Sequence, residues 1–254
     1  NDPYRGGTHL PDITVVSPCF DDQARLVAIL ASRAHHADVG GISPGSMPAC
    51  SRSVSDEGVL IGPTRIMRND VLERELLLRL FRGGRYPSRD PELNLGEVEA
   101  QLAANRRGVR LFRQLLLEQG QHQVQAYLRH VLDHTEGLLR ARLRELVGGS
   151  VGNLAPTLRR CALQNDQGAT IQLALSIDPE RGDVKVDFSG TSAQLADNYN
   201  APSAVVRAAV LYVLRCLLDH PVPLNEGFAR PLQLILPPDR CWRHDHPRRW
   251  SRAM

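Results

Sequence analysis

The sequence lacks the patterns that mark several large classes of proteins. No apolar run approaches the ~20 residues that a membrane-spanning helix needs, and no secretory signal is visible. There is no Walker A sequence and no dinucleotide fingerprint, so we do not expect this chain to bind ATP or NAD by itself. With 42% hydrophobic and 23% charged residues over 254 positions, the composition is that of a soluble globular protein with one or two domains.

The cysteines are few and scattered. The chain has five of them, an odd number with no C-x-x-C pair, so no zinc finger or disulfide framework is indicated. Ordinary reduced thiols favour a cytoplasmic location over an oxidising compartment. Cys50 follows a loop rich in glycine and proline, and a nucleophilic role for it is the weaker alternative.

The net charge of +3 is unevenly distributed. Residues 239–254 contain five arginines and two aspartates, a net +3, so residues 1–238 balance near zero. The body of the chain therefore offers no basic face for nucleic acid. We interpret the tail as aberrant and foreign to the fold, with a natural basic interaction tail as the alternative. Because the chain opens on Asn1 and not on Met, we also expect a fragment or a processed piece.

Two groups of metal-ligating residue types lie at the ends of a predicted β-hairpin. His9–Asp12 precedes the apolar run Ile13–Val16, and His35–Asp38 follows the apolar run Leu26–Ala31. The segment Pro18–Ala24 between the two runs is rich in turn formers. This pattern predicts two antiparallel strands that bring both groups to the same end of the hairpin.

A turn centred on Asp22 would pair residues whose numbers sum to about 44. It would place Asp12 opposite Ser32 and His9 opposite His35. Directly opposed Cβ atoms lie roughly 4.5–5.5 Å apart, so two imidazoles and a carboxylate could share one ion. These ligand types suit Zn, Mn or Fe. The alternative is that the histidines are hydrogen-bonded loop residues and that Asp12 caps a turn.

Proline and glycine shape the backbone beside these groups. Pro11 fixes its own φ and disfavours helix at Leu10, so His9 and Asp12 are expected on an extended or turn segment. The pairs Gly6–Gly7 and Gly40–Gly41 allow tight turns with positive φ beside the candidate ligands.

The middle of the chain predicts a loop followed by helices. Residues 42–69 are rich in glycine, proline and serine, and Asp70 is expected to cap a short helix that runs through Arg82. Apolar residues at three- and four-residue spacing predict helices over 95–119 and 121–147, separated by Gly120, as an antiparallel α-helical hairpin. His122, His130 and His134 on the second helix favour a solvated face over a metal site, because no H-E-x-x-H motif accompanies them.

The last third predicts a mixture of strands and one helix. A glycine-rich linker at 148–152 precedes strands at 169–177 and 184–188, which a loop over 178–183 joins into a hairpin. The helix expected at 203–218 is apolar nearly all round and is therefore predicted to be buried, and 232–236 is a final strand. The fold class is α+β, with mixed β-hairpins or sheet, the helical hairpin and the buried C-terminal helix.

Eight stretches of the chain together form a specific pattern: Asn1–Asp12, Ser32–Gly41, Pro44–Pro48, Glu57–Ile61, Gln101–Asn105, Asp187–Thr191, Asn200–Pro202 and Leu217–Asn225. In these stretches the sequence resembles the hydantoinase B/oxoprolinase family, and within it the segment Gly84–Leu95 is most similar to the 5-oxoprolinases. The resemblance runs to about residue 238. Within one family domain we expect a metal-site β/loop region at 1–93, the helical hairpin at 94–149, an α+β region at 150–238 and the tail at 239–254.

The resemblance implies hydrolytic ring opening of a cyclic amide, with 5-oxo-L-proline opened to L-glutamate at the expense of ATP. A separate kinase-like half, of the hydantoinase A type, would bind ATP with magnesium and phosphorylate the amide oxygen. The resemblance also implies metal ligands at His9, Asp12 and His35, with a fourth aspartate upstream of Asn1. A soluble, cytoplasmic and oligomeric enzyme without nucleic-acid or membrane partners is expected.

Two further residues are candidates for catalysis. Asp38 could orient the His35 imidazole or act as a general base, and His36 could donate to a developing oxyanion; hydrogen bonding within the loop is the alternative for both. An N-methylhydantoinase or a ketone carboxylase subunit is the alternative activity. A truncated fragment with little or no activity is the third interpretation.

Overall fold

The structure is a computed structural model of the chain, and it describes residues 1–148, 157–219 and 221–238. These residues form two compact units. The first is Asn1–Gly120 with Ala196–Pro202, and the second comprises the described residues of Gln121–Leu195 and Ser203–Asp245. Both helices and strands are present, which confirms the α+β class. Within the described ranges, no helix combines the length and apolarity that a membrane crossing requires.

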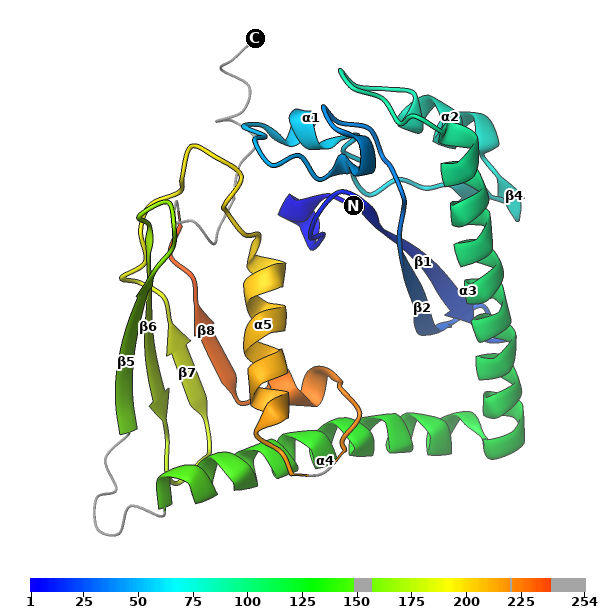
Figure 1. The fold of residues 1–254 in the computed structure, drawn as a ribbon. Helices are drawn as coiled ribbons and strands as arrows, with labels where there is room; N and C mark the ends of the chain where they lie inside the picture. The colour runs from blue at the N-terminus through cyan, green and yellow to red at the C-terminus, as the bar shows by residue number, and fades with distance from the viewer. Residues whose placement is uncertain (149–156, 220, 239–254) are drawn as a thin grey trace. The chain divides into compact units, whose positions relative to one another are not determined.

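The first unit is built on a β-hairpin covered by a long helix (Figure 1). Several short helices and strands lie in the chain between the hairpin and this helix. In chain order its elements are η1 (Pro3–Arg5), β1 (Asp12–Phe20), β2 (Leu26–His35), η2 (Pro44–Ser46), α1 (Val54–Glu57), β3 (Met67–Arg68), β4 (Val71–Leu72), α2 (Arg74–Phe81) and α3 (Pro91–Gln119).

Burial explains why this unit holds together. Strand β1 alternates between buried and exposed side chains, so one face of the hairpin packs on α3, and α2 packs on α3 in turn. Removing such apolar surface from water is the main favourable term in folding. The buried core cluster consists of Leu10, Ile13, Val15, Val39, Leu77, Leu78, Phe81, Leu95, Val98 and Leu102.

The hairpin forms as predicted, but the predicted register is wrong. Asp12 pairs with His35 and not with Ser32, because the strands continue farther and the chain turns over 21–25. The carboxylate of Asp21 holds this turn by accepting hydrogen bonds from the backbone N–H groups of Gln23 and Arg25, both at 2.9 Å. The register also shifts at a bulge between Cys19 and Phe20. An extra residue in one strand leaves no mark in the apolar pattern.

Pro18 lies inside β1, although the sequence placed it in the turn. The hairpin is a two-stranded sheet, so each strand has one free edge. A proline, which has no N–H to donate, is tolerated in such a strand.

The helices of the first unit begin at other residues than expected. Helix α2 starts after Glu73, so the prediction that Asp70 caps it is wrong; Asp70 instead occupies a turn with φ of 62° between β3 and β4. Helix α3 begins at Pro91, earlier than predicted, because the Asp90 carboxylate accepts a hydrogen bond from the N–H of Leu93 at 3.0 Å. An aspartate cap followed by proline is a strong start signal.

The second unit contains a four-stranded sheet with the order β5-β6-β7-β8, visible in Figure 1. Neighbouring strands are antiparallel except β7 and β8, which are parallel. The predicted hairpin of 169–177 with 184–188 and the final strand are confirmed. The elements are α4 (Gln121–Gly148), β5 (Thr157–Gln164), β6 (Thr170–Ile177), β7 (Val184–Asp187), α5 (Ser203–Cys216), η3 (Glu226–Ala229) and β8 (Leu232–Ile235).

Strand β5 was not predicted. Its sequence does not alternate between polar and apolar residues, and its side chains from Leu158 to Gln164 are exposed. Its pairing with β6 along eight residues defines it as a strand. A pattern based on one buried face cannot detect a strand that buries neither face.

Helix α5 forms close to the predicted range, but the prediction that it is buried all round is wrong. Val206 and Leu214 are buried, whereas Tyr212 is 69% exposed and Val213 is 58% exposed. Apolar composition thus overestimated the burial of this helix.

Gly120 separates α3 from α4 as predicted, with a φ of 80° that glycine adopts readily. Each helix packs with elements of its own unit: α3 on the β1–β2 hairpin, and α4 on η3 and β6. Their pairing as an antiparallel hairpin and the predicted domain boundaries stay predictions. The linker at 149–152 and the tail at 239–254 lie outside the described residues.

Candidate metal centre

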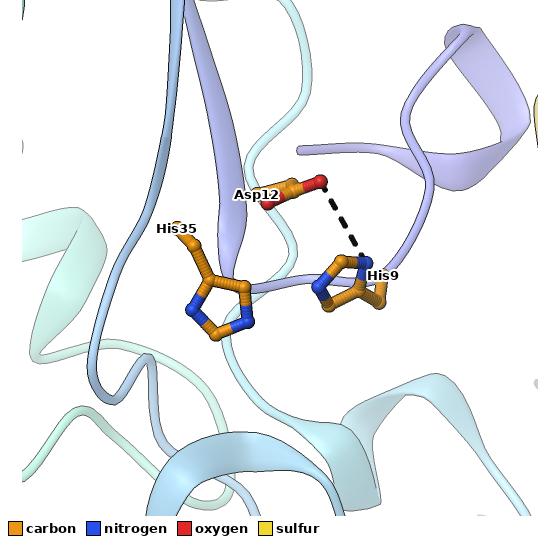
Figure 2. A group of neighbouring side chains, drawn as sticks. All are labelled: His9, Asp12 and His35. Atoms are coloured by element: carbon orange, nitrogen blue, oxygen red, sulfur yellow. Dashed lines mark ion pairs between the residues drawn. The ribbon is translucent and has the colours of Figure 1, made fainter.

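Three predicted ligands come together at the open end of the hairpin. Asp12 begins β1 and His35 ends β2, while His9 lies in a turn closed by the bond from the Asp12 N–H to the His9 carbonyl oxygen at 3.2 Å. One ligand atom from each of the three side chains lies within 4.8 Å of the others. Figure 2 shows the three side chains pointing toward one another. Throughout 1–148, 157–219 and 221–238 this is the single group of three or more such ligands.

The hydrogen-bond pattern of the hairpin explains the close approach. The N–H of His36 donates to the carbonyl oxygen of Pro11 at 2.9 Å, which makes residues 11 and 36 a hydrogen-bonded pair. Bonded and non-bonded pairs alternate in antiparallel strands, so Asp12 and His35 form the adjacent non-bonded pair. Non-bonded partners have Cα atoms only ~4.5 Å apart, and their side chains are closer.

The carboxylate of Asp12 has three polar neighbours. The Thr8 hydroxyl donates to its Oδ2 at 3.1 Å, His9 Nδ1 lies 3.7 Å from the same oxygen, and Arg33 Nη1 lies 3.8 Å from it. The rings of His9 and His35 have centroids 5.0 Å apart. The His9 side chain is 37% exposed and that of Asp12 is 17% exposed, so an ion can enter from solvent.

Glycine is required beside the ligands, as predicted. Gly6, Gly40 and Gly41 have φ values of 91°, 95° and 92°, in the left-handed region that other residues rarely adopt. Gly7 is needed for a different reason: a Cβ on it would lie 2.5 Å from the carbonyl oxygen of Asn1.

The donor set fits a catalytic type of metal site. Two imidazoles and one carboxylate are borderline and hard ligands that suit Zn, Mn or Fe. Catalytic zinc sites commonly use three protein ligands and keep a further position for water or substrate. The number and types of donors in His9, Asp12 and His35 match that requirement.

Asp38 lies in a loop whose backbone it organises. Its carboxylate accepts hydrogen bonds from the N–H groups of Gly40 and Gly45, both at 2.9 Å, and it pairs with Arg89 Nη1 at 2.7 Å. Burial acts to raise the pKa of Asp38, but hydrogen bonds from the backbone of Arg89, Gly40 and Gly45 lower it overall. Asp38 is not a member of the three-ligand group.

His36 is completely buried and is not a member of that group either. Its ring stacks on Phe81 at a centroid distance of 6.0 Å, and its Nδ1 lies 2.8 Å from Glu97 Oε2. Burial lowers the pKa of His36, against the opposing effect of the Glu97 charge. The catalytic roles of Asp38 and His36 stay predictions; the contacts observed are those of the loop-bonding alternative.

Comparison with known proteins places the chain in a family. The family model described as hydantoinase B/oxoprolinase matches residues 1–249. The chain belongs to the hydantoinase B/oxoprolinase family. The match continues past residue 238, where the sequence pattern was expected to end.

Relatives of this hydantoinase B/oxoprolinase chain include 5-oxoprolinase 1 of Arabidopsis thaliana, 38% identical over 93% of the chain, and 5-oxoprolinase of Saccharomyces cerevisiae, 36% identical over 93%. The chain spans 20% and 19% of those two proteins. Among solved structures, the ATP-dependent caprolactamase from Pseudomonas jessenii is similar with a TM-score of 0.80 and 22% identity. That likeness covers 97% of this chain and 41% of the caprolactamase chain, and it shows a shared fold.

A polar face of α3, which the sequence did not reveal, supports the β1–β2 hairpin. The Gln101 amide donates to the carbonyl oxygens of Ile13 at 2.9 Å and Ser32 at 3.1 Å. The Asn105 amide donates to the carbonyl oxygen of Val15 at 3.0 Å. Both amides are nearly fully buried and lie four residues apart on the helix. Gln101 and Asn105 lie on the same face of the helix as Val98 and Leu102. This spacing was a signal that the amides are buried against the hairpin, and a count of apolar residues alone does not detect it.

The three histidines of α4 and Cys50 are not members of the three-ligand group. His122, His130 and His134 are exposed on α4, which confirms the predicted solvated face, and the rings of the latter two stack at 6.2 Å. Cys50 is exposed with a free thiol.

Proposed function

We propose that this chain forms the metal-bearing part of an enzyme that opens a cyclic amide by hydrolysis, with 5-oxo-L-proline as substrate and L-glutamate as product. The observation that carries the proposal is the convergence of His9, Asp12 and His35 within 4.8 Å. The relatives named 5-oxoprolinase, at 38% and 36% identity, support this choice of substrate.

His9, Asp12 and His35 would hold one divalent ion of Mn, Zn or Fe. Such an ion acts as a Lewis acid on a reacting carbon–oxygen bond and lowers the pKa of water toward ~7. Within this chain, the Thr8 hydroxyl would support the metal ligand Asp12: it donates a hydrogen bond to the carboxylate and holds one of its oxygens in place. A bonded carboxylate keeps its orientation as a ligand, which is the usual role of such outer partners.

Amide activation would come from another protein part. An unactivated amide resists water, and this sequence has no Walker A motif with which to use ATP. A kinase-like half of the hydantoinase A type is therefore the proposed partner, with ATP and magnesium bound there. The chain spans about a fifth of the 5-oxoprolinases that it matches, which leaves room in those proteins for such a half. Cytoplasmic location and oligomerisation stay predictions.

Metal analysis tests the proposal directly. The purified chain, loaded with Mn, Zn or Fe and then desalted, is expected to retain the metal at a stoichiometry near one by elemental mass spectrometry. His9→Ala is expected to abolish retention, whereas His130→Ala, which removes an exposed helical histidine, is expected to leave it unchanged. Absence of metal in the unaltered chain would overturn the proposal and favour a truncated, inactive fragment.

A second measurement tests the substrate. In a full-length relative, replacement of the residue aligned with His9 is expected to stop formation of glutamate from 5-oxo-L-proline. Turnover of N-methylhydantoin or carboxylation of a ketone, with no action on 5-oxo-L-proline, would assign the alternative activities instead.

A further inference from the structure

Glu97 on α3 lies beside the buried ring that immediately follows the ligand His35. Its Oε2 is 2.8 Å from His36 Nδ1, the distance of an ion pair, and this buried oxygen has no hydrogen-bond partner among the described residues. Two amides of the same helix face approach the same ring: Asn94 Nδ2 lies 3.1 Å from His36 Nδ1, and Gln101 Oε1 lies 3.5 Å from His36 Nε2. Three side chains of one helix therefore surround a single imidazole.

Hydrogen bonds also connect this group of side chains to the backbone of both strands. The Gln101 amide nitrogen donates to carbonyl oxygens of Ile13 on β1 and Ser32 on β2, so its oxygen is the atom that faces His36. The Asn94 amide nitrogen also donates to the carbonyl oxygen of Asp38 at 2.8 Å. The helix, which lies along the hairpin in Figure 1, thus fixes the backbone on both sides of His36.

The position of His36 determines that of the ligands for two reasons. Successive side chains of a strand point to opposite faces, so a ring held in the core directs the neighbouring His35 outward. In addition, the His36 N–H bonds the carbonyl oxygen of Pro11, which lies between His9 and Asp12. Displacement of His36 would therefore disturb all three candidate ligands.

We propose that Glu97 is a positioning residue of the metal centre: its carboxylate faces His36 Nδ1 and holds that ring, while Gln101 and Asn94 fix the backbone beside it, and this keeps His9, Asp12 and His35 close together. This proposal rests on the proposed function, since it presumes that the three residues bind metal. Partners one step removed from a metal typically change its affinity 10- to 100-fold when they are lost. Glu97 acts on the candidate ligands through the His36 ring and the backbone beside that ring, so it does not need to contact the ion.

The test compares Glu97→Ala with Glu97→Gln in the 254-residue chain. Zn²⁺ affinity is measured by calorimetry, and Co²⁺ coordination by its visible d–d absorption. Glu97→Ala is expected to weaken Zn²⁺ binding by up to about 10-fold, the lower end of the range for partners bonded directly to a ligand, and to change the Co²⁺ band. Glu97→Gln keeps a polar group beside the ring and is expected to restore most of the affinity.

Two matched variants separate positioning from general loss of stability. Glu118→Ala removes an exposed carboxylate from the same helix and is expected to change neither affinity nor melting temperature. Val98→Ala removes core volume from the same helix face, where Val98 is 2% exposed, and is expected to lower the melting temperature but not the affinity.

Two results would overturn the proposal. One is unchanged Zn²⁺ affinity and Co²⁺ absorption in Glu97→Ala. The other is an affinity loss in Val98→Ala equal to that of Glu97→Ala at the same fall in melting temperature. If His9→Ala abolishes binding while Glu97→Ala leaves the affinity unchanged, the positioning role fails and the metal centre stands. If the unaltered chain binds no metal, both fail.

Discussion

Asp12 and His35 are cross-strand neighbours in a non-hydrogen-bonded pair of the β1–β2 hairpin, and Arg33, on the same face of β2, lies 3.8 Å from the Asp12 carboxylate. The candidate ligands therefore depend on strand register. Because side chains alternate between faces, a slip of one residue would move either Asp12 or His35 to the opposite face. A cation already lies beside one of the ligands.

The positive charge of Arg33 should oppose metal binding. Arg33→Gln is expected to tighten Zn²⁺ binding up to about fivefold, since an exposed ion pair contributes up to about 1 kcal/mol that the metal must replace. Calorimetry at low and moderate salt measures the effect, which should shrink as salt rises. Arg25→Gln, which removes the Asp21 partner at the far end of the hairpin, serves as control. Weaker binding in Arg33→Gln would show that Arg33 supports the site.

Metal should stabilise the first unit. Binding to the folded state alone adds about 2.7 kcal/mol when free metal is at 100 times its Kd. For a protein of this size that corresponds to a rise of roughly 5–10 °C in melting temperature, which calorimetry can follow and a chelator should reverse. In His35→Ala the rise should disappear. An equal rise in that variant would indicate binding elsewhere.

Glu57 should make stability depend on pH. Burial raises the pKa of Glu57, and the Ser51 hydroxyl that donates to it at 2.8 Å offsets part of the effect. A raised folded-state pKa means that ionisation disfavours folding, with no cost below the ordinary carboxyl value of about 4.3. The free energy of unfolding of Glu57→Gln, relative to the unaltered chain, is therefore expected to increase from pH 4 upward. Urea denaturation across that range measures it, and a constant difference would contradict the expectation.

The approach of the candidate ligands to one another could be predicted because their placement is local. Asp12 and His35 flank one short hairpin, so two apolar runs and a turn were enough to bring them to one end. Their register could not be predicted, because it depends on the turn held by Asp21 and on the bulge at Cys19, which the apolar pattern does not record.

Longer-range features were less accessible from the sequence. Gln101 bonds carbonyl oxygens 69 and 88 positions away. Its place on the apolar face of the helix indicates burial, but a helical pattern does not reveal which carbonyl oxygens a buried amide reaches. Tyr212 and Val213 on α5 were expected to be buried because the helix is apolar all round, yet burial depends on what packs against a helix and not on its composition.

Asp38 should act first as a structural residue of its loop. Asp38→Asn leaves at least one of the backbone donors from Gly40, Gly45 and Arg89 without its acceptor, at a cost of about 1–3 kcal/mol at neutral pH. Since the folded-state pKa is lowered, the stabilisation is present above the ordinary value of about 3.9 and is lost as pH falls through the folded pKa. The two proteins should therefore converge in stability in acid.

The same variant separates the two roles of Asp38. In a full-length relative, a general base predicts a fall in kcat at temperatures where Asp38→Asn is still folded. Full turnover under those conditions would restrict Asp38 to the loop.

Gly40 should tolerate no side chain. Its φ of 95° is strained for other residues, and a Cβ would lie 2.1 Å from the carbonyl oxygen of Tyr86, a backbone atom that cannot rotate away. Strained φ alone costs about 1–3 kcal/mol, so Gly40→Ala is expected to lower the free energy of unfolding by more than about 2 kcal/mol in urea denaturation. Gly62→Ala is the matched control, because its φ is not positive and its Cβ would meet nothing within 4 Å. Equal stability of the two variants would mean that the loop after His35 adopts another backbone path, and the ligand geometry that depends on this loop would then have to be abandoned.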